Sequence, residues 1–305
     1  MDQFPEGFKS GFVAVMGRPN VGKSTFVNRL LGTKIAATSP WPQTTRKTQM
    51  GILTLENAQI VFVDTPGVHN PIHKLGERMN QEALKVLEDS DVILFLVDIS
   101  QPPDEEDKLL ANSLSKLRRS VQTIMTLNKL DLVSQEIFEK HQELYQILVP
   151  LSESFAVSST QGDNIEALVN KVISLLPAGP PFFPDDQITD LYEREIAADL
   201  IREAIIYNLR AEVPHSIAVR IDEFKDKEQN LTYIAATLFV ERDSQKGIVI
   251  GKGGGTLKKI GIDARQKIEE LIGRKVYLQL RVKVRKNWRN DDAALRLFGF
   301  KSLKS

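Results

Sequence analysis

The sequence predicts two domains of different classes: an α/β domain with a mostly parallel sheet and helices on both faces, followed by a smaller α+β domain. Three observations support this fold class. Near-continuous apolar runs alternate with amphipathic segments from Phe12 to about Leu176, which is typical of parallel strands buried on both sides. A proline-rich stretch then interrupts the pattern. Beyond it, strand-sized segments alternate in polarity, as on a half-buried sheet.

The first domain is expected at residues 8–176, with strands and helices in alternation. Its predicted strands are Phe12–Met16, Gln59–Val63, Val92–Asp98, Val121–Leu127 and Phe155–Val157. Its predicted helices are Gly76–Glu88, Asp104–Lys116 and Asn164–Leu176, and another follows the first strand, with apolar residues at helical spacing from Phe26 to Leu31. This alternation predicts a doubly wound sheet, in which ligands bind at the carboxyl ends of the strands.

A linker is predicted at residues 177–187, because the ten residues from Pro177 contain four prolines and one glycine. Such a composition sustains neither a helix nor a central strand. The second domain is expected at 188–290 and a tail at 291–305. Its pattern predicts a helix at Thr189–Leu209, strands at Ser216–Ile221, Leu231–Glu241 and Val276–Arg285, and a glycine-rich turn with a helix within Gly247–Ile272. The expected order is α-β-β-α-α-β.

Composition limits the class of protein. The 40 basic and 40 acidic residues among 305 give a formal net charge of +0, so the overall charge does not favour nucleic acid as a partner. The absence of cysteine excludes disulfides and thiolate metal sites, and suits a reducing compartment. The first residues do not resemble a secretory signal, and the longest apolar runs are only strand-sized. We therefore expect a cytoplasmic protein.

A phosphate-binding loop is predicted between the first strand and the first helix. Residues 17–24 fit the pattern G-x-x-x-x-G-K-[ST], and strand, glycine loop and helix are the context that this pattern requires. Backbone N–H groups and the helix N-terminus attract phosphate, Lys23 reaches the β- and γ-phosphates, and the Ser24 hydroxyl ligates Mg²⁺. The residues expected at the nucleotide here are Gly17, Asn20, Val21, Gly22, Lys23, Ser24 and Thr25.

Two further segments predict contacts to Mg²⁺ and the γ-phosphate. Asp64 ends a predicted strand and opens the sequence Asp-Thr-Pro-Gly, so its carboxylate is placed to hold Mg²⁺ and the Gly67 N–H to bind the γ-phosphate. Between this motif and the loop, a threonine hydroxyl is expected to complete the Mg²⁺ shell. We favour Thr45, and the adjacent Thr44 remains an alternative.

The base is predicted to be guanine. Asn128, Lys129 and Asp131 follow a predicted strand in the pattern N-K-x-D. The Asp131 carboxylate can accept hydrogen bonds from the guanine N1–H and exocyclic amine, a pair that adenine does not offer. Ser158 and Ser159 end another strand, where a backbone N–H is expected to contact the guanine oxygen.

The motifs GRPNVGKS, QTTR, DTPG, NKLD and VSS, in this order, resemble the Era family of translation-factor-related GTPases. The resemblance covers nearly the whole chain and implies a GTPase domain followed by a type II KH domain, with GTP or GDP and Mg²⁺ bound. Ser159 departs from the alanine expected in the family, but only its backbone N–H is required.

The resemblance also bears on hydrolysis. Val68 stands where a Ras-like GTPase has the glutamine that orients the attacking water, so slow intrinsic turnover is expected. Asn20 matches a position that ligates a potassium ion in related GTPases, and a K⁺ ion there would offset charge in the transition state. The residues expected to support catalysis are Lys23, Thr45, Gly67 and Asn20.

A second glycine-rich loop lies in the C-terminal half. Gly251, Lys252, Gly253 and Gly254 form a G-x-x-G sequence, which in a KH domain clamps the backbone of about four nucleotides. The neighbouring Lys258 and Lys259 add positive charge.

The segment from Lys246 to Arg289 holds 13 basic residues against three acidic ones. Arg281, Lys283 and Arg285 alternate along the last predicted strand and are expected to contact RNA. Trp288 is expected either to stack on a base or to pack within the domain.

The family resemblance implies a GTP-hydrolysing switch that binds 16S ribosomal RNA and assists assembly of the 30S ribosomal subunit, as a monomer. One alternative is a nucleotide-stabilised RNA-binding protein that barely turns over, which Val68 favours. Another is a signalling GTPase at the membrane, because the basic C-terminal face can attract anionic lipid. Peripheral association with the cytoplasmic face of the inner membrane is a further possible partnership of the protein.

Overall fold

The computed structural model describes residues 5, 7–32, 48–65, 71–117, 120–150, 152–189, 193–210, 212–227 and 230–300. Within these residues the chain forms two compact units. The first lies within 5–189, and the second consists of 193–300 together with Pro71–Arg78. Each unit has a sheet and a hydrophobic core of its own.

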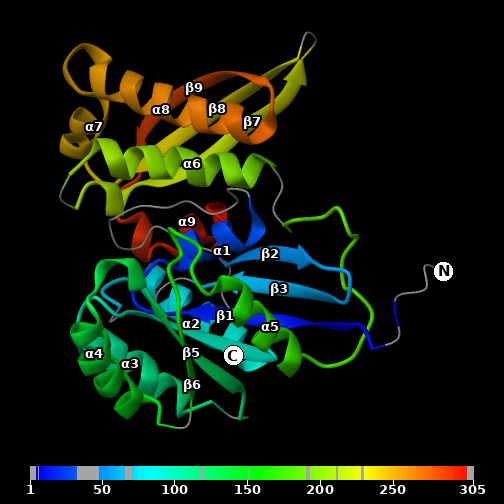
Figure 1. Cartoon of the computed structure of the whole chain (residues 1–305). Coiled ribbons are helices and arrows are strands. Elements are labelled where there is room, and N and C mark those ends of the chain that lie inside the picture. Colours follow the sequence, from blue (N-terminus) through cyan, green and yellow to red (C-terminus); the bar gives the residue numbers. More distant parts are fainter. Residues whose placement is uncertain are drawn as a thin grey trace. The chain divides into compact units, whose positions relative to one another are not determined.

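The described part of the first unit contains a six-stranded sheet in the order β2-β3-β1-β4-β5-β6 (Figure 1). Pairing is parallel throughout except between β2 and β3. The strand bounds are β1 Lys9–Met16, β2 Gln49–Thr54, β3 Ala58–Asp64, β4 Val92–Asp98, β5 Gln122–Asn128 and β6 Glu153–Ala156. Every residue of β3 and β4 is buried, which explains their near-continuous apolar sequences.

Helices cover both faces of this sheet, as the sequence predicted. Apolar side chains of α1 and α5 pack against one face and those of α2, α3 and α4 against the other. The helix bounds are α1 Lys23–Leu31, α2 Lys74–Asp89, α3 Glu105–Leu114, α4 Gln135–Leu148 and α5 Ile165–Leu175, with a 3₁₀ turn, η1, at Leu130–Leu132. The sequence analysis missed β2 and α4. The strand β2 is short and lies at the sheet edge, where only one neighbour defines it.

The segment predicted as a linker is anchored to the first unit. The Gln59 side chain of β3 accepts hydrogen bonds from the Phe182 and Phe183 N–H groups (2.7 and 3.0 Å) and donates one to the Phe183 carbonyl (2.8 Å). Farther on, the Ile52 N–H of β2 donates to the Ile188 carbonyl at 2.9 Å. Prolines remove N–H groups from this stretch, but the groups named here still bond to a side chain of β3 and to the backbone of the edge strand β2.

The described part of the second unit has a three-stranded sheet in the order β7-β8-β9, with β7 antiparallel and β9 parallel to β8. Its elements are α6 Glu193–Asn208, β7 Ala218–Lys227, β8 Leu231–Val240, α7 Asp243–Ile250, α8 Gly255–Ile272, β9 Lys275–Val284 and α9 Asp292–Leu297. Short 3₁₀ turns occur at η2 Pro214–Ser216, η3 Lys252–Gly254 and η4 Trp288–Asn290. The predicted order α-β-β-α-α-β is confirmed, with α6, α7 and α8 packed on one sheet face.

The end of the described chain is packed into the second unit. Trp288 is fully buried, and its indole N–H donates to the Ser216 carbonyl at 2.8 Å. The rings of Trp288 and Phe298 meet edge to face with centroids 5.3 Å apart. Of the two roles considered for Trp288, the structure therefore supports packing within the domain, and the predicted tail begins with the ordered helix α9.

Candidate functional site

The glycine loop runs from Gly17 to Gly22 between β1 and α1, at the carboxyl edge of the sheet (Figure 1). Gly22 has a φ of 103°, and a side chain there would collide with the Asn128 amide. A side chain at Gly17 would collide with the Leu96 carbonyl of β4. Both glycines are therefore required, because the loop passes directly against the ends of neighbouring strands.

Lys23 lies at the first position of α1, with only 8% of the residue exposed. Its ammonium group donates to the carbonyls of Gly17 and Arg18 at 2.8 and 3.0 Å. Burial lowers the pKa of Lys23 from 10.5 to about 8, although the Asp64 carboxylate acts in the opposite direction. A buried cation at a helix N-terminus is suited to an anionic ligand, whose charge would replace the missing hydration.

The Ser24 hydroxyl donates to Asp64 at 2.8 Å. Ser24 is the second residue of α1, which follows β1, and Asp64 ends the adjacent parallel strand β3, where it pairs in register with Val15 of β1. A hydroxyl and a buried carboxylate beside the glycine loop are hard oxygen ligands of the kind that Mg²⁺ uses, so these residues fit the ion. Thr45 with its alternative Thr44, Gly67 and Val68 lie outside the described residues.

Asn128, at the end of β5, joins the loop to the predicted guanine region. Its amide donates to the Val21 carbonyl at 2.7 Å, and its oxygen accepts from the Ser159 N–H and hydroxyl at 3.0 and 2.8 Å. The Asp131 carboxylate accepts from the Ser158 hydroxyl at 2.6 Å. The structure thus brings the loop, the N-K-x-D motif and the serine motif together, as the sequence predicted.

Lys129 is in the left-handed region, with a φ of 68°, and its ammonium group contacts Asp98 at the end of β4 at 2.6 Å. Burial alone would raise the pKa of Asp98, but hydrogen bonds from Lys129 and Ser100 outweigh it and hold the pKa below its ordinary value. The lysine of this motif is therefore held by a charged partner that the sequence analysis did not identify.

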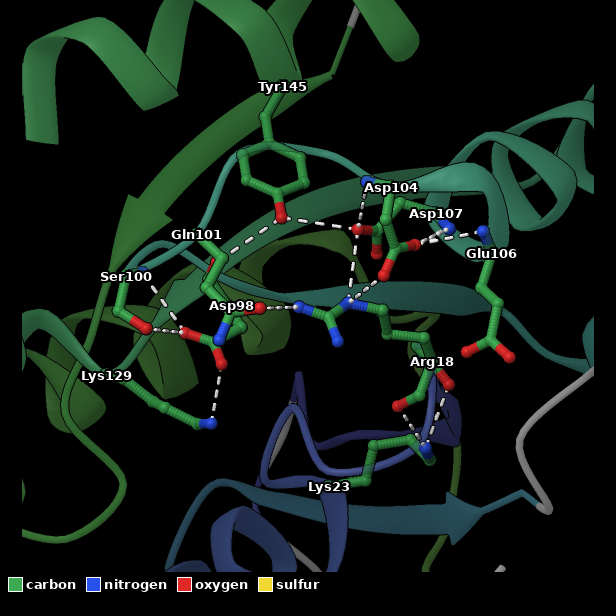
Figure 2. A network of polar contacts seen from close by, with 11 residues as sticks. Arg18, Lys23, Asp98, Ser100, Gln101, Asp104, Glu106, Asp107, Lys129 and Tyr145 are labelled. Carbon is green, nitrogen blue, oxygen red and sulfur yellow. Dashed lines mark hydrogen bonds and ion pairs between the residues drawn. The ribbon is translucent and has the colours of Figure 1, made fainter. Parts of the chain in front are cut away.

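A buried polar network joins the glycine loop to two helices, and this was also missed (Figure 2). The Arg18 guanidinium donates to the Asp107 carboxylate of α3 at 3.2 Å, and the Tyr145 hydroxyl of α4 donates to the same oxygen at 3.3 Å. Asp107 also accepts from the Asp104 N–H in the capping box of α3. Arg18 and Asp107 are 89 positions apart, so no local pattern predicts their contact.

The remaining loop residues differ in exposure. Asn20 is exposed and has a φ of 66°, Val21 is fully buried, and Thr25 is half-buried in the first turn of α1. Asn20 is therefore accessible to a ligand at the loop.

The second glycine loop connects α7 and α8 through η3. Gly251, Gly253 and Gly254 have φ values of 72°, 60° and 78°, which explains why three glycines stand there. Lys252, Lys258 and Lys259 are exposed. Beside them lies a groove of about 470 Å³ lined by Gly254, Leu257, Lys258, Gly261, Ile262, Arg265, Val276, Tyr277, Leu278 and Leu280.

The three basic residues predicted on the last strand are not equivalent. Arg281 and Lys283 are exposed on β9, whereas Arg285 follows its end and pairs with Asp291 at 3.1 Å. None of the three lines the groove.

Within the described residues, no group of three or more histidine, aspartate and glutamate side chains is arranged to hold a metal ion. No helix there has the length and apolar composition needed to cross a bilayer.

Two family models match the chain. The model described as "50S ribosome-binding GTPase" matches residues 12–129, and the model of the KH domain matches residues 212–289. Together with the glycine loop and the N-K-x-D site, these matches define the class of protein: a GTPase that carries an RNA-binding type of domain.

Curated relatives specify the family. The chain is 47% identical to the GTPase Era of Geotalea uraniireducens and 44% identical to that of Carboxydothermus hydrogenoformans, each over 96% of this chain and 98% of the relative. The chain therefore belongs to the Era family of GTPases.

Solved structures agree with this assignment. Era in complex with MgGDPNP and nucleotides 1506–1542 of 16S ribosomal RNA superposes with a TM-score of 0.91 at 40% identity, covering 96% of this chain and 99% of that one. A point variant of Aquifex aeolicus Era bound to GDP and AlF₄⁻ gives a TM-score of 0.90 at the same identity and coverage. The predicted fold class, an α/β GTPase domain followed by a KH domain, is confirmed.

Proposed function

We propose that the chain is a GTP-hydrolysing switch whose nucleotide state sets how its KH domain binds small-subunit ribosomal RNA. The observation that carries this proposal is Asn128, which ties the phosphate loop at Val21 to the guanine region at Ser159. The two ends of a guanine nucleotide are thereby served by one connected set of hydrogen bonds. GTP and GDP are the nucleotides that such a site fits.

Each site residue has a proposed role. Asp131 is proposed to accept from guanine, and the Ser159 N–H, which donates to Asn128 in this structure, is proposed to contact the guanine oxygen. Lys23 and the loop N–H groups hold the phosphates, while Ser24 and Asp64 hold Mg²⁺. The ion neutralises charge on the β- and γ-phosphates when bound. Thr45 and Gly67 are proposed to contact Mg²⁺ and the γ-phosphate.

Hydrolysis is proposed to depend on a monovalent cation. Val68 cannot orient a water molecule by a side-chain hydrogen bond, so its position offers no substitute for glutamine. The exposed Asn20 amide oxygen is a suitable K⁺ ligand next to the phosphates. A cation there would offset the charge that develops in the transition state.

The RNA partner is proposed from the family. Because a related Era was solved with part of 16S ribosomal RNA, we propose that this chain binds the same RNA and assists 30S subunit assembly. Gly251, Lys252, Gly253 and Gly254 are proposed to clamp the RNA backbone, with Lys258 and Lys259 beside them. Arg281, Lys283 and Arg285 are proposed to add contacts from the last strand.

The finer organisation is also proposed. The GTPase domain is taken as 8–176, the linker as 177–187, the KH domain as 188–290 and the tail as 291–305. We propose a cytoplasmic monomer. Peripheral binding at the inner membrane is a further proposal, based on the basic residues of the second unit.

Phosphate release from GTP and ATP, measured in K⁺ and in Na⁺, tests the proposal. Wild type should hydrolyse GTP, slowly, and faster in K⁺ than in Na⁺. Asp131→Asn should weaken GTP binding about 100-fold, because it removes charge-assisted acceptors, and should improve binding of xanthosine triphosphate.

Equal rates of hydrolysis in the two salts would contradict the proposed cation at Asn20 and no other part of the proposed function. GTP binding without turnover under any condition, with RNA binding retained, would support the alternative of a nucleotide-stabilised RNA-binding protein.

A further inference from the structure

The β7-β8-β9 sheet has a second face, opposite to the one on which α6, α7 and α8 pack in the described residues. On β9, Val276, Leu278 and Leu280 belong to the core beneath α6, α7 and α8. Residues at alternate positions of the strand point to the other face, and Tyr233 of β8 lies opposite Tyr277 in register. We call this surface the open face; it comprises Tyr233, Tyr277, Gln279, Arg281 and Lys283.

Two tyrosines form a flat platform on the open face. The rings of Tyr233 and Tyr277 are stacked, with centroids 5.8 Å apart and planes 18° apart. The Tyr233 hydroxyl donates to Gln279 at 2.7 Å, and the Lys227 ammonium lies 4.9 Å from the centre of the Tyr233 ring. Tyr277 is nevertheless 60% exposed. A ring that is held in place yet exposed can stack on a planar ligand without a further ordering cost.

Positive charge surrounds this platform. Arg281 and Lys283 are exposed next along β9. On β7, which is separated from β9 by β8, Asp222 and Glu223 are ion-paired within their own strand, with Arg220 at 2.6 Å and with Lys225 at 3.0 Å. Asp226, the third acidic residue of β7, pairs with Arg274 at 3.0 Å. Each carboxylate of β7 thus has a cation of its own, so Arg281 and Lys283 add positive charge to the open face, where, against the effect of burial, Lys283 also helps to lower the pKa of Asp222.

The open face is bounded at one end and continuous with the groove at the other. At the first end, Phe239 packs on Phe298 with centroids 5.0 Å apart, so the chain itself covers that part of the sheet. At the other end, Tyr277 lines the groove beside the glycine loop. This is possible because β9 is the edge strand. A ligand leaving the groove meets Tyr277 first and the two cations next.

We propose that the open face is a second binding surface for single-stranded RNA, which takes the nucleotides next to those in the glycine-loop groove. A base stacks on Tyr277, and phosphates lie against Arg281 and Lys283. An exposed aromatic ring followed by basic side chains is the combination that binds single strands without reading their sequence. The inference rests on the proposed RNA binding by this domain, and extends it from about four nucleotides to a longer strand.

The test compares two RNA lengths on the full chain. Affinities are measured by fluorescence anisotropy for single strands of about four and about twelve nucleotides. The variant is Arg281→Gln with Lys283→Gln. Its matched control is Lys85→Gln with Lys140→Gln, which removes two exposed lysines from the first unit. Tyr277→Leu removes the ring, and Tyr277→Phe keeps it.

The charge variant should lose about tenfold in affinity for the long RNA and reduce its salt slope by about 1.4, because two phosphate contacts are lost. Its affinity for the short RNA should stay at the wild-type value, which also shows that the groove is folded. Tyr277→Leu should lose about tenfold for the long RNA, whereas Tyr277→Phe and the lysine control should bind it as wild type does.

Unchanged long-RNA binding by the charge variant would overturn the inference, as would equal losses for both lengths. The same holds if the variant lost only its binding to vesicles rich in phosphatidylglycerol, which would assign the face to a membrane. Lys252→Gln should weaken the binding of both RNAs. If wild type bound neither RNA, the proposed function itself would fail, which is a distinguishable result.

Discussion

At the scale of single residues, the charged form of Lys23 is energetically unfavourable. Its charge is buried, and carbonyls of the glycine loop supply the contacts described above. Phosphate would supply opposite charge at the same place. The nucleotide and the proton on Lys23 should therefore bind cooperatively, because each favours the other.

This linkage predicts a pH effect on nucleotide binding. Since the pKa of Lys23 is about 8 without nucleotide, most molecules carry a neutral amine at about pH 8.5. Bound phosphate raises that pKa, so GDP binding should take up about half a proton or more. GDP affinity should fall as pH rises through 8.

Calorimetry in two buffers with different ionisation enthalpies measures this uptake. At about pH 6.5 Lys23 is already charged, so its contribution should vanish there. A proton balance that does not change between the two pH values would contradict the prediction.

At the scale of elements, the two glycine loops are stabilised in different ways. The phosphate loop is braced from outside by Asp107, whose carboxylate joins Arg18, Tyr145 and the start of α3 (Figure 2). Burial raises the pKa of Asp107, while the Asp104 N–H and Arg18 act in the opposite direction. The second glycine loop has a different requirement, because its backbone occupies conformations that favour glycine.

Asp107→Ala should destabilise the protein by about 3 kcal/mol, because the Arg18 charge and the Tyr145 hydroxyl lose a buried partner. Urea unfolding of the nucleotide-free protein measures the loss. Glu105→Ala is the control, since it removes an exposed carboxylate that pairs with Lys108 in the same helix. Equal midpoints for the two variants would show that the buried network contributes nothing.

Alanine substitutions at two positions of the second glycine loop, Gly253 and Gly251, should have unequal effects on stability. Gly253→Ala should cost about 1 kcal/mol, because its left-handed backbone disfavours a side chain but open space surrounds it. Gly251→Ala should cost about 3 kcal/mol, because its backbone is in a region reserved for glycine and the new methyl group would strike Thr256. The free energies of unfolding of the two variants test this prediction. Equal losses of stability for Gly253→Ala and Gly251→Ala would contradict it.

At the scale of the whole molecule, two units with separate cores belong to one switch. Several hydrogen bonds, including those made by the Phe8 and Ile188 carbonyls, attach the proline-rich segment to the first unit. Just beyond the predicted linker, Thr189 forms a β-bridge with Gly51 of β2, so the chain follows the first unit's sheet edge past residue 187. The strand β2 in turn pairs with β3, which ends at Asp64, the proposed Mg²⁺ ligand.

RNA affinity should depend on the nucleotide. We expect at least a fivefold difference between the GTP-analogue and GDP forms, about the lower range of coupling between two sites. Binding of a 16S ribosomal RNA fragment, measured with each nucleotide, checks this. Asp131→Asn is the control, because it should lose the response to guanine nucleotides while its RNA site is intact. Identical affinities with both nucleotides would rule out a switch.

Much of this organisation could be predicted from sequence. The two fold classes and the order of elements in the second unit rest on local patterns, and the structure bears them out. The phosphate loop and the N-K-x-D site were also predicted locally, and the structure brings their residues close together at the strand ends. The prediction failed for β2 and α4. The strand β2 is defined by its pairing with β3, and α4 contributes Tyr145 to a shared core. Such partners are not visible in a local window.

The sequence by itself determined the residue types of the proposed nucleotide site, because a glycine loop, a strand-end carboxylate and N-K-x-D are each recognised within a few residues. Only the tertiary structure decided which groups brace that chemistry. It joined Arg18 to Asp107, packed Trp288 inside the second unit and directed Tyr277 to the open face. The physical reason is that hydrogen bonds and packing act over short distances in space, whatever the separation of the residues along the chain.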